Sequence, residues 1–177
     1  MIRRATQFDI EDVNEIYLDA KALFRSLQIN QWQDLDGYPN LQTIIADINK
    51  NSLYVKEVNG KIVGTIVLQK EKETCYDNIY EGNWLNDDEY YVIHRIAVRN
   101  GYYGMGYGKE LMRFCEEETI KDKVYNIRVD TKHENKIMRK ILENLEYREC
   151  GIIFLSRPNV IDNKRLAYQK ILKNNNC

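Results

Sequence analysis

The chain has 177 residues, which fits a single domain over 1–177 with a substantial buried core. Its 26 basic and 27 acidic residues give a net charge of −1, which argues against a nucleic-acid binder driven by overall charge. No apolar run approaches about 18 residues, so no segment is expected to span a membrane.

The four cysteines, at 75, 115, 150 and 177, lack the spacing of a zinc site, and only two histidines could join them. We therefore expect no metal. Scattered thiols without a signal peptide indicate a reduced, cytoplasmic protein.

The N-terminal part of the chain predicts two helices. Residues 1–5 form a short strand candidate, and Asp9 is placed to cap a helix whose apolar face runs from Ile10 to Leu27. Residues 29–40 lose this period and form a loop. A second short helix is expected over 41–48.

A hairpin and a long connection follow. Residues 52–58 and 61–69 are predicted strands, and Asn59-Gly60 between them is the strongest short hairpin signal, so an antiparallel pair is expected. Residues 71–88 are polar and aromatic without a period, and are longer than a plain hairpin connection needs. We expect either a lid over a substrate site or a floppy surface insertion.

The central segment, 90–118, is predicted as a strand, a glycine loop and a helix. An apolar run at 92–98 is followed by glycines at 101, 104, 106 and 108, and then by apolar residues at helical spacing. Glycines at this position allow positive φ or a close approach to the main chain. The N–H groups of a helix N-terminus hold phosphate, so the segment predicts a pyrophosphate-bearing ligand bound mainly by backbone.

Two common phosphate loops do not fit this spacing. A Walker loop ending at Lys109 would need Gly in place of Tyr103 and Ser or Thr in place of Glu110. A dinucleotide fingerprint that starts at Gly104 would need Gly in place of Lys109. A nucleotide-binding α/β protein nevertheless stays open as a hypothesis.

The C-terminal part predicts a strand over 124–130, a helix over 135–145, and strands over 147–155 and 165–172. Together the elements form an α/β fold with a mixed, mostly antiparallel sheet of about seven strands. Helices are expected on both faces, which makes a layered α/β/α sandwich. Parallel pairing is expected only at the central unit, where a helix connects two strands.

Three motifs resemble the GCN5-related N-acetyltransferase (GNAT) family. Residues 103–108, YGMGYG, resemble its acyl-CoA loop, which reads Arg or Gln, two residues, Gly, one residue, then Gly or Ala. Tyr103 replaces the basic or amide residue. Residues 94–98, HRIAV, are similar to the fourth strand of the family, and 127–130, IRVD, with Asn135 resemble its fifth strand and the Asn at the next helix.

The resemblance implies an acetyl-CoA-dependent N-acetyltransferase that acts on a primary amine of a small molecule or a protein. Acetyl-CoA and the amine would be its partners, and the oligomeric state stays open, a homo-oligomer included. A non-catalytic acyl-CoA-binding module of the same fold is the alternative. The implied cofactor-binding residues are Ile96, Ala97, Val98, Tyr103, Gly104, Met105, Gly106, Tyr107, Gly108, Lys109 and Asn135.

Acetyl transfer needs a stabilised carbonyl oxygen and a neutral amine. By resemblance, N–H groups of 96–98 would stabilise the charge on the oxygen. A lysine-like amine has a pKa near ~10.4, so a base is needed, and His94, with an ordinary pKa near ~6.5, shares strand parity with residues 96 and 98. A structural histidine is the plain alternative. Glu89, or Asp88 acting through water, is the second candidate base, and for both the alternative is a solvated charge.

The leaving thiolate receives a proton, in many family members, from a Tyr seven residues after the Asn. Leu142 stands there and cannot donate. Another donor could serve instead, namely Tyr102, Tyr103, Tyr107 or a water. Alternatively, the thiolate could leave unassisted, because a thiol has a pKa near ~8.5. The third alternative is that the protein binds CoA without turnover. Glu146 stands where the family often has Gly, so the helix exit is expected to differ.

In the topology of the family, the loop between the first two helices lines the acceptor side. Trp32 and Tyr38 are therefore the candidates for substrate contacts, although Trp32 could simply cover the edge of the core. Asn135 is expected to cap its helix, to contact the CoA chain, or to do both. Arg95, on the face opposite His94, is expected on the substrate side or in a buried ion pair.

Overall fold

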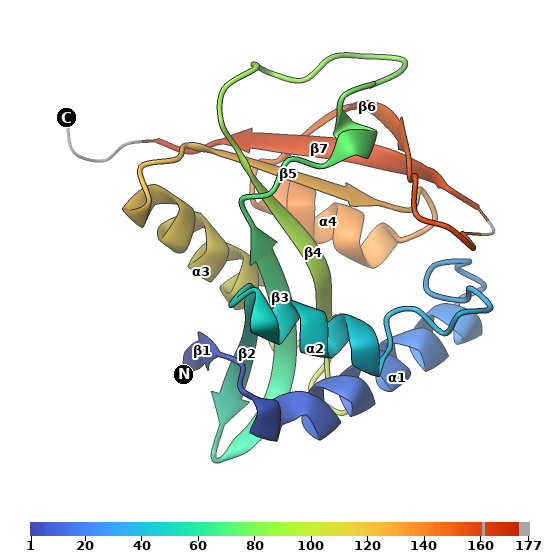
Figure 1. Ribbon diagram of the computed structural model, residues 1–177, viewed down its shortest axis with the longest axis vertical. Helices are drawn as coiled ribbons and strands as arrows, with labels where there is room; N and C mark the ends of the chain where they lie inside the picture. The colour runs from blue at the N-terminus through green and yellow to red at the C-terminus, as the bar shows by residue number, and fades with distance from the viewer. Residues whose placement is uncertain (161, 174–177) are drawn as a thin grey trace. The chain divides into compact units, whose positions relative to one another are not determined.

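The computed structural model describes residues 1–160 and 162–173. Within these residues, seven strands form a mixed sheet in the order β1-β2-β3-β4-β5-β7-β6, accompanied by four α-helices and two short 3-10 turns (Figure 1). This confirms the predicted fold class. The elements are β1 (Ile2–Arg4), η1 (Gln7–Asp9), α1 (Ile10–Ser26), α2 (Leu41–Asn49), β2 (Leu53–Val58), β3 (Lys61–Gln69), η2 (Thr74–Tyr76), β4 (Tyr91–Val98), α3 (Tyr107–Lys121), β5 (Asn126–Thr131), α4 (Lys136–Asn144), β6 (Arg148–Phe154) and β7 (Lys164–Ile171).

The chain divides into two compact units. Unit 1 contains residues 1–68 and 94–114, and unit 2 contains residues 69–93 together with the chain from 115 onward. The predicted single domain over 1–177 stays a prediction. Each unit is described by itself below.

The hairpin of unit 1 joins β2 to β3 as predicted. The two strands pair antiparallel, and β1 pairs antiparallel with β2. Asn59 and Gly60 have φ values of 50° and 75°, the left-handed conformations that a tight two-residue hairpin turn requires. The local turn chemistry therefore fixes the register of the pair.

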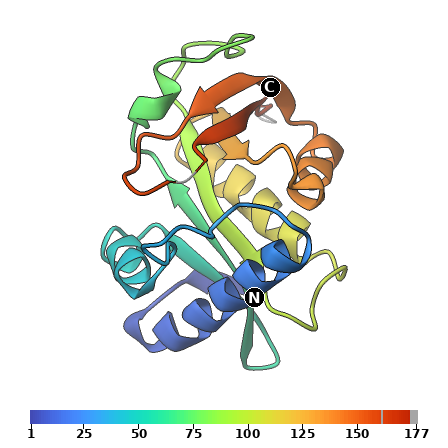
Figure 2. The same ribbon diagram turned by 90° about the vertical axis from the view of Figure 1, so that its right-hand side faces the viewer.

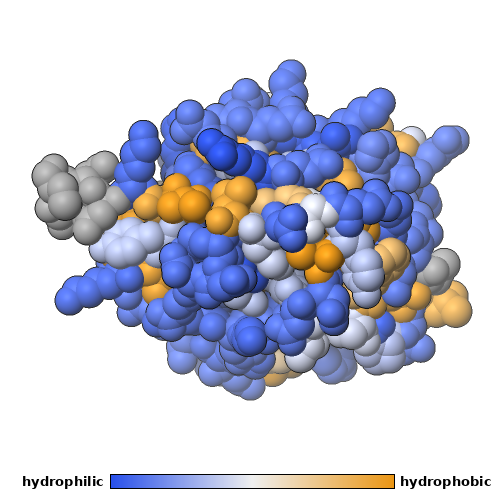
Figure 3. All heavy atoms as spheres, turned by 90° about the horizontal axis from the view of Figure 1, so that it is seen from above, coloured by the Kyte–Doolittle hydropathy of each residue, from blue (hydrophilic) through white to orange (hydrophobic). Residues whose placement is uncertain are grey.

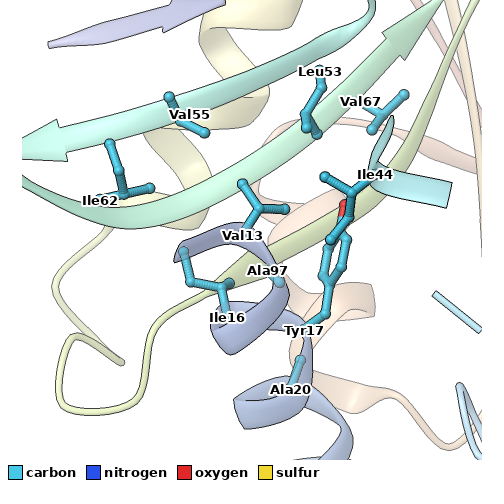
Figure 4. Close-up of a cluster of buried hydrophobic side chains, with 10 residues drawn as sticks. All are labelled: Val13, Ile16, Tyr17, Ala20, Ile44, Leu53, Val55, Ile62, Val67 and Ala97. Atoms are coloured by element: carbon cyan, nitrogen blue, oxygen red, sulfur yellow. The ribbon is translucent and has the colours of Figure 1, made fainter. Parts of the chain in front are cut away.

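The side chains of β2 alternate between two layers of helices in unit 1. Leu53 and Val55 face the core under α1 and α2 (Figure 4). Tyr54 contacts the ring of Phe114 on α3 at 5.0 Å between centroids, and Lys56 also reaches α3. Helices thus cover both faces of this part of the sheet. The core cluster is Val13, Ile16, Tyr17, Ala20, Ile44, Leu53, Val55, Ile62, Val67 and Ala97.

Unit 2 contains the predicted parallel pair. Residues 91–93 of β4 run parallel to residues 127–129 of β5, whereas β5 with β7 and β6 with β7 pair antiparallel. Figure 2 shows the orange helix α4 leading into the orange-red strand β6. The apolar stripe of α4 buries Met138 and Leu142.

The segment 71–88 is anchored within unit 2, so the floppy alternative is wrong. Tyr76 is 2% exposed, and its hydroxyl donates to Asp130 Oδ1 at 2.8 Å. Trp84 Nε1 donates to the Tyr76 carbonyl at 2.9 Å. Tyr80 exchanges two backbone hydrogen bonds of 2.8 Å with Ile152 on β6. Aromatic burial and satisfied polar groups hold the connection in place.

A buried arginine adds to this anchor. The guanidinium of Arg128 on β5 lies 4.1 Å from the ring centroid of Trp84 and 3.9 Å from that of Tyr90. Its Nη2 donates to the Asn86 carbonyl at 2.9 Å. A cation desolvated between two aromatic faces is strongly attracted to both of them.

Asp9 does not cap α1, which corrects the prediction. Its carboxylate accepts from Arg3 Nη2 and Nη1 at 2.8 and 2.9 Å and from the Thr6 N–H at 2.8 Å. The hydrogen bond from Arg3 lowers the pKa of Asp9 to about 2. The turn η1 precedes α1, so Asp9 has helix-like angles (φ −94°, ψ −2°) instead of the extended angles of an N-cap.

Hydrophilic side chains predominate on the face drawn in Figure 3. Among the described residues, no helix is both long and apolar enough to cross a membrane. Cys75, Cys115 and Cys150 are free thiols. Cys177 lies outside the described residues.

Replacing Gly82 with Ala tests the anchor of the segment 71–88. The added Cβ would lie 2.0 Å from the carbonyl oxygen of Cys150 on β6, so the backbone must shift. We expect a loss of more than about 2 kcal/mol in the free energy of unfolding, measured with urea. The control is Gly37→Ala: its Cβ meets no atom within 4 Å but takes φ +69°, at a cost of about 1 kcal/mol. Equal losses in the two variants would contradict the close contact.

Candidate functional site

The glycine loop of unit 1 starts from an anchored residue. Arg99 is 8% exposed and directly follows β4. Its Nε donates to the Ile62 carbonyl at 2.7 Å, its Nη1 donates to Glu15 Oε2 at 2.6 Å, and its Nη2 donates to Asp12 Oδ1. These charge-assisted bonds to α1 and β3 fix the point at which the chain leaves the sheet.

Three glycines of the loop have left-handed backbone. Gly101, Gly104 and Gly106 have φ values of 86°, 76° and 85°, which residues with a Cβ adopt at a cost. A Cβ added at any of the three would meet no atom within 4 Å. The glycines therefore serve the course of the backbone and leave space beside it. Figure 2 shows the yellow-green loop projecting beyond the end of β4.

The loop leads directly into the first turn of α3. Gly106 accepts at its carbonyl from the Glu110 N–H at 3.1 Å and has no side chain with which to cap the helix. The N–H groups of 107–109 belong to the first turn, which has no intrahelical acceptors for them. This part of the backbone can bind an anion.

Lys56 forms an ion pair with Glu110, the acidic residue in the first turn of α3. Lys56 Nζ lies 2.5 Å from Glu110 Oε2 and 4.8 Å from the ring centroid of Tyr107. The side chain of Lys56 is 9% exposed. The carboxylate of Glu110 would otherwise repel an anion at the helix N-terminus, and the pairing reduces that repulsion.

Tyr103 is 40% exposed. It stands where the acyl-CoA loop of the GNAT family has Arg or Gln. Burial of the phenol, together with the nearby charge of Asp19, raises its pKa. Asp19 also accepts from the Asn100 N–H at 2.8 Å. The side chains of Met105 and Tyr103 are exposed, those of Tyr107 and Lys109 are half-buried, and Gly104 and Gly106 lie between them.

Arg95 distorts β4 in unit 1 without ending it. It has φ +50°, which is unusual for a non-glycine residue within a strand. Nε and Nη2 donate to the two carboxylate oxygens of Asp47 at 2.9 and 2.7 Å, and Nη1 donates to Tyr38 Oη at 2.7 Å. The side chains of Arg95 and Asp47 are 11% and 5% exposed. Of the two alternatives for Arg95, the buried ion pair is confirmed.

The parity argument for His94 is wrong as a result. Alternation between two faces requires extended backbone at every residue, and Arg95 breaks it, so the orientation of His94 does not follow from that of residues 96 and 98. His94 is half-buried. Burial raises the pKa of Asp47, against the opposing charges of Arg95 and, more weakly, His94. His94 therefore lies in the electrostatic neighbourhood of this pair.

The two acceptor-side candidates belong to the same loop of unit 1. Trp32 packs edge-on against the rings of Tyr17 and Phe24 at 5.5 and 5.4 Å. Its role in covering the edge of the core is confirmed. Tyr38 is half-buried and accepts from Arg95. Lys21 Nζ donates to the Pro39 carbonyl at 2.7 Å, which further fixes the loop.

Ile96 and Val98 are half-buried, whereas Ala97 is part of the core cluster of unit 1. In unit 2, Glu89 has a side chain 66% exposed, and Lys70 Nζ lies 3.4 Å away. Its surroundings are those of a solvated charge. The Asn135 side chain accepts from the Met138 N–H at 3.1 Å, so its capping role is confirmed.

The helix α4 lacks a proton donor at the position that the resemblance indicates. Leu142 is fully buried on the apolar stripe. Glu146 has φ +63°, and the Tyr147 N–H donates to the Leu142 carbonyl at 2.9 Å. A left-handed residue after a helix favours Gly. This chain therefore leaves α4 through a left-handed residue whose side chain adopts the conformation at a cost.

Sequence reasoning missed three residues of this region: Asp47, Arg99 and Lys56. Asp47 gave a usable signal, because it lies between Ile44 and Ile48 on the apolar face of α2. A carboxylate on a buried stripe requires a cation. Arg99 and Lys56 gave no comparable local signal. In the part of the chain that the structure describes, no group of three or more His, Cys, Asp or Glu side chains is arranged to hold a metal ion.

Comparisons with known proteins point to one family. Residues 11–147 match the family model described as "Acetyltransferase (GNAT) family". A GNAT-family acetyltransferase from Streptococcus agalactiae is 34% identical over 98% of this chain and 96% of its own, with a TM-score of 0.89. No curated protein matches.

Two further solved structures share the fold. A GNAT-family acetyltransferase from Listeria monocytogenes is 21% identical over 97% of this chain and 94% of its own, with a TM-score of 0.74. A ribosomal-protein-alanine N-acetyltransferase from Brucella melitensis is 20% identical over 97% of this chain and 99% of its own, with a TM-score of 0.65. At these identities the likeness concerns the fold alone.

If the loop holds CoA, as the family resemblance implies, replacing Arg99 with Leu should weaken that binding although Arg99 need not touch the ligand. The variant loses the bonds to α1 that fix the start of the loop. We expect a fall in affinity of more than about tenfold by titration calorimetry. Arg25→Leu, at an exposed position in the last turn of α1, should leave the affinity unchanged. Equal affinities in the two variants would show that the loop does not depend on its anchor.

Proposed function

Because the chain belongs to the GNAT family of acetyltransferases, we propose that it transfers an acetyl group from acetyl-CoA to a primary amine of a small molecule or a protein. One domain over 1–177 would contain the whole activity. The free thiols at Cys75, Cys115 and Cys150 support a cytoplasmic location.

The glycine loop carries the proposal. Three left-handed glycines with open space beside them lead into a helix whose first-turn N–H groups lack intrahelical acceptors. The pyrophosphate of CoA is an anion of the size and charge that such a turn binds. The proposed contacts are made by the backbone of 103–109 and by the Lys109 side chain. Asn135 would add a contact to the CoA chain.

The chemistry is the attack of an amine on a thioester. A neutral amine nitrogen would attack the carbonyl carbon while N–H groups of 96–98 donate to the oxygen as it gains negative charge. The carbon–sulfur bond then breaks, and the electron pair leaves on sulfur as a thiolate. The nitrogen gives up one proton, which His94 is proposed to accept. Its half-buried side chain near Asp47 supports this role.

The acceptor is proposed to approach from the side of Trp32 and Tyr38. The guanidinium of Arg95 and the carboxylate of Asp47 are paired with each other in this region, so neither is offered as the main partner of a charged acceptor. Glu89 remains the second candidate base. Its exposure to solvent favours His94 over it.

Leu142 supports a second candidate function. A buried leucine cannot protonate the thiolate, and Tyr103 alters the loop at the position of the basic or amide residue. A non-catalytic module that binds acyl-CoA would need neither residue. CoA binding is common to both proposals, and turnover separates them.

Release of free thiol from acetyl-CoA, measured with a panel of amines, tests the enzymatic proposal. The panel contains spermidine, glucosamine, a peptide with a free α-amine and an N-terminally blocked peptide that contains lysine. We expect thiol release above the rate of hydrolysis for at least one amine. Calorimetry with CoA, ATP and NAD runs in parallel. Binding of CoA without release for any amine would favour the module, and tighter binding of ATP or NAD would overturn the assignment to CoA.

Replacing Gly106 with Val should abolish most CoA binding. Valine strains the left-handed backbone and adds bulk beside the first turn of α3. Gly101→Val is the matched control, because φ is 86° there against 85° at Gly106 and both positions are open. We expect the affinity of the Gly106 variant to fall more than about tenfold below that of the control. Similar affinities would argue against phosphate binding at 103–109.

A further inference from the structure

The left-handed residue in β4 has a side chain that explains its conformation. Arginine is disfavoured at φ +50°, so surrounding contacts must hold it there. The fork of Arg95 makes a two-pronged ion pair with Asp47, the most directional pairing that a guanidinium forms. Both side chains are buried, which limits the screening of the pair by salt.

The partners of Arg95 come from the acceptor side. Asp47 is in the last turn of α2, where its carbonyl also accepts from the Ser52 N–H at 3.0 Å. Tyr38 is in the loop 28–40, between Gly37 and Pro39, whose carbonyls accept from Lys21 Nζ. One guanidinium therefore connects a strand, a helix and a loop of unit 1.

We propose that Arg95 is a positioning residue that holds the backbone of 96–98 and the acceptor loop 28–40 in one fixed arrangement. This inference rests on the proposed function, because it assigns the thioester to 96–98 and the acceptor to the loop. Arg95 itself touches neither reactant. Its contacts set the distance between the amine nitrogen and the carbonyl carbon of the thioester. Misplacement by about 1 Å costs about 100-fold in rate.

The contacts with Asp47 and with Tyr38 have separate consequences. The pair with Asp47 holds the left-handed turn of β4 and so aims the N–H groups that follow it. The bond to Tyr38 holds the loop. Loss of the Tyr38 hydroxyl should therefore affect the acceptor alone, whereas loss of the guanidinium should affect both reactants.

Four variants distinguish these consequences. Arg95→Gly removes the side chain but keeps a residue that adopts φ +50° freely. Arg95→Lys keeps the charge without the fork. Tyr38→Phe removes one hydroxyl. Tyr91→Phe is the matched control, since it removes a hydroxyl that bonds Asp122 at 3.0 Å near the start of the same strand.

Amide hydrogen exchange of the full chain tests the arrangement without any ligand. We expect Arg95→Gly and Arg95→Lys to speed exchange at least about tenfold in peptides covering 28–40 and 94–99, equivalent to about 1.4 kcal/mol of local opening. Tyr38→Phe should do so in 28–40 alone, and Tyr91→Phe in neither. Unchanged exchange of 28–40 in the Arg95 variants would overturn the proposal. If Arg95→Gly unfolds the whole chain, Arg95→Lys and Tyr38→Phe decide.

Kinetics with acetyl-CoA and the best amine of the panel tests the consequence for the reaction. Tyr38→Phe should raise KM for the amine about tenfold and leave kcat/KM for acetyl-CoA within about twofold, while Arg95→Lys lowers kcat about tenfold. Normal KM for the amine in Tyr38→Phe would overturn the role of the loop. Failure of wild type to acetylate any amine would count against the proposed function, and the exchange experiment would still decide the arrangement.

Discussion

The first-turn N–H groups of α3 are the feature on which the proposed activity depends. They must stay accessible, because any side chain in the loop that folded over them would take the place of an anion. The chain meets this constraint with glycines at 104 and 106. It compensates for the flexibility of these glycines by fixing Arg99 before the loop and by pairing Lys56 with Glu110 after it. An open backbone is thus held between two rigid ends.

Ion pairs with a largely buried basic partner recur around this loop and its strand. Replacing a pair that is buried on both sides, such as Arg95 with Asp47, by apolar residues is often neutral for stability, because both charges lose their hydration. Their benefit is geometric, since a guanidinium fork accepts its partners only in certain directions. Arg95 and Arg99 lie four residues apart on one segment, and each connects it to a different helix, α2 or α1.

Local patterns predicted the elements of the fold well. The strand at 61–69 has the predicted bounds, because the Asn59-Gly60 turn that sets its start is a short-range signal. The conformation of Arg95 was not predictable, since its partners are 48 and 57 residues away in sequence. Similarly, Leu85 is tied to Gln169, 84 residues away. Periodicity carries no information on such contacts, so it does not distinguish a lid from a loose insertion around Leu85.

The apolar residue on α4 has a consequence for how the proposed reaction would respond to alkaline solution. A phenol acting as proton donor ionises near pH ~10 and then ceases to donate, which makes turnover decline above that pH. Leu142 has no proton to lose. If the thiolate leaves unassisted, the rate would then rise as the amine and its base become neutral and stay level afterwards, with the departure of sulfur governed by the acidity of the CoA thiol itself.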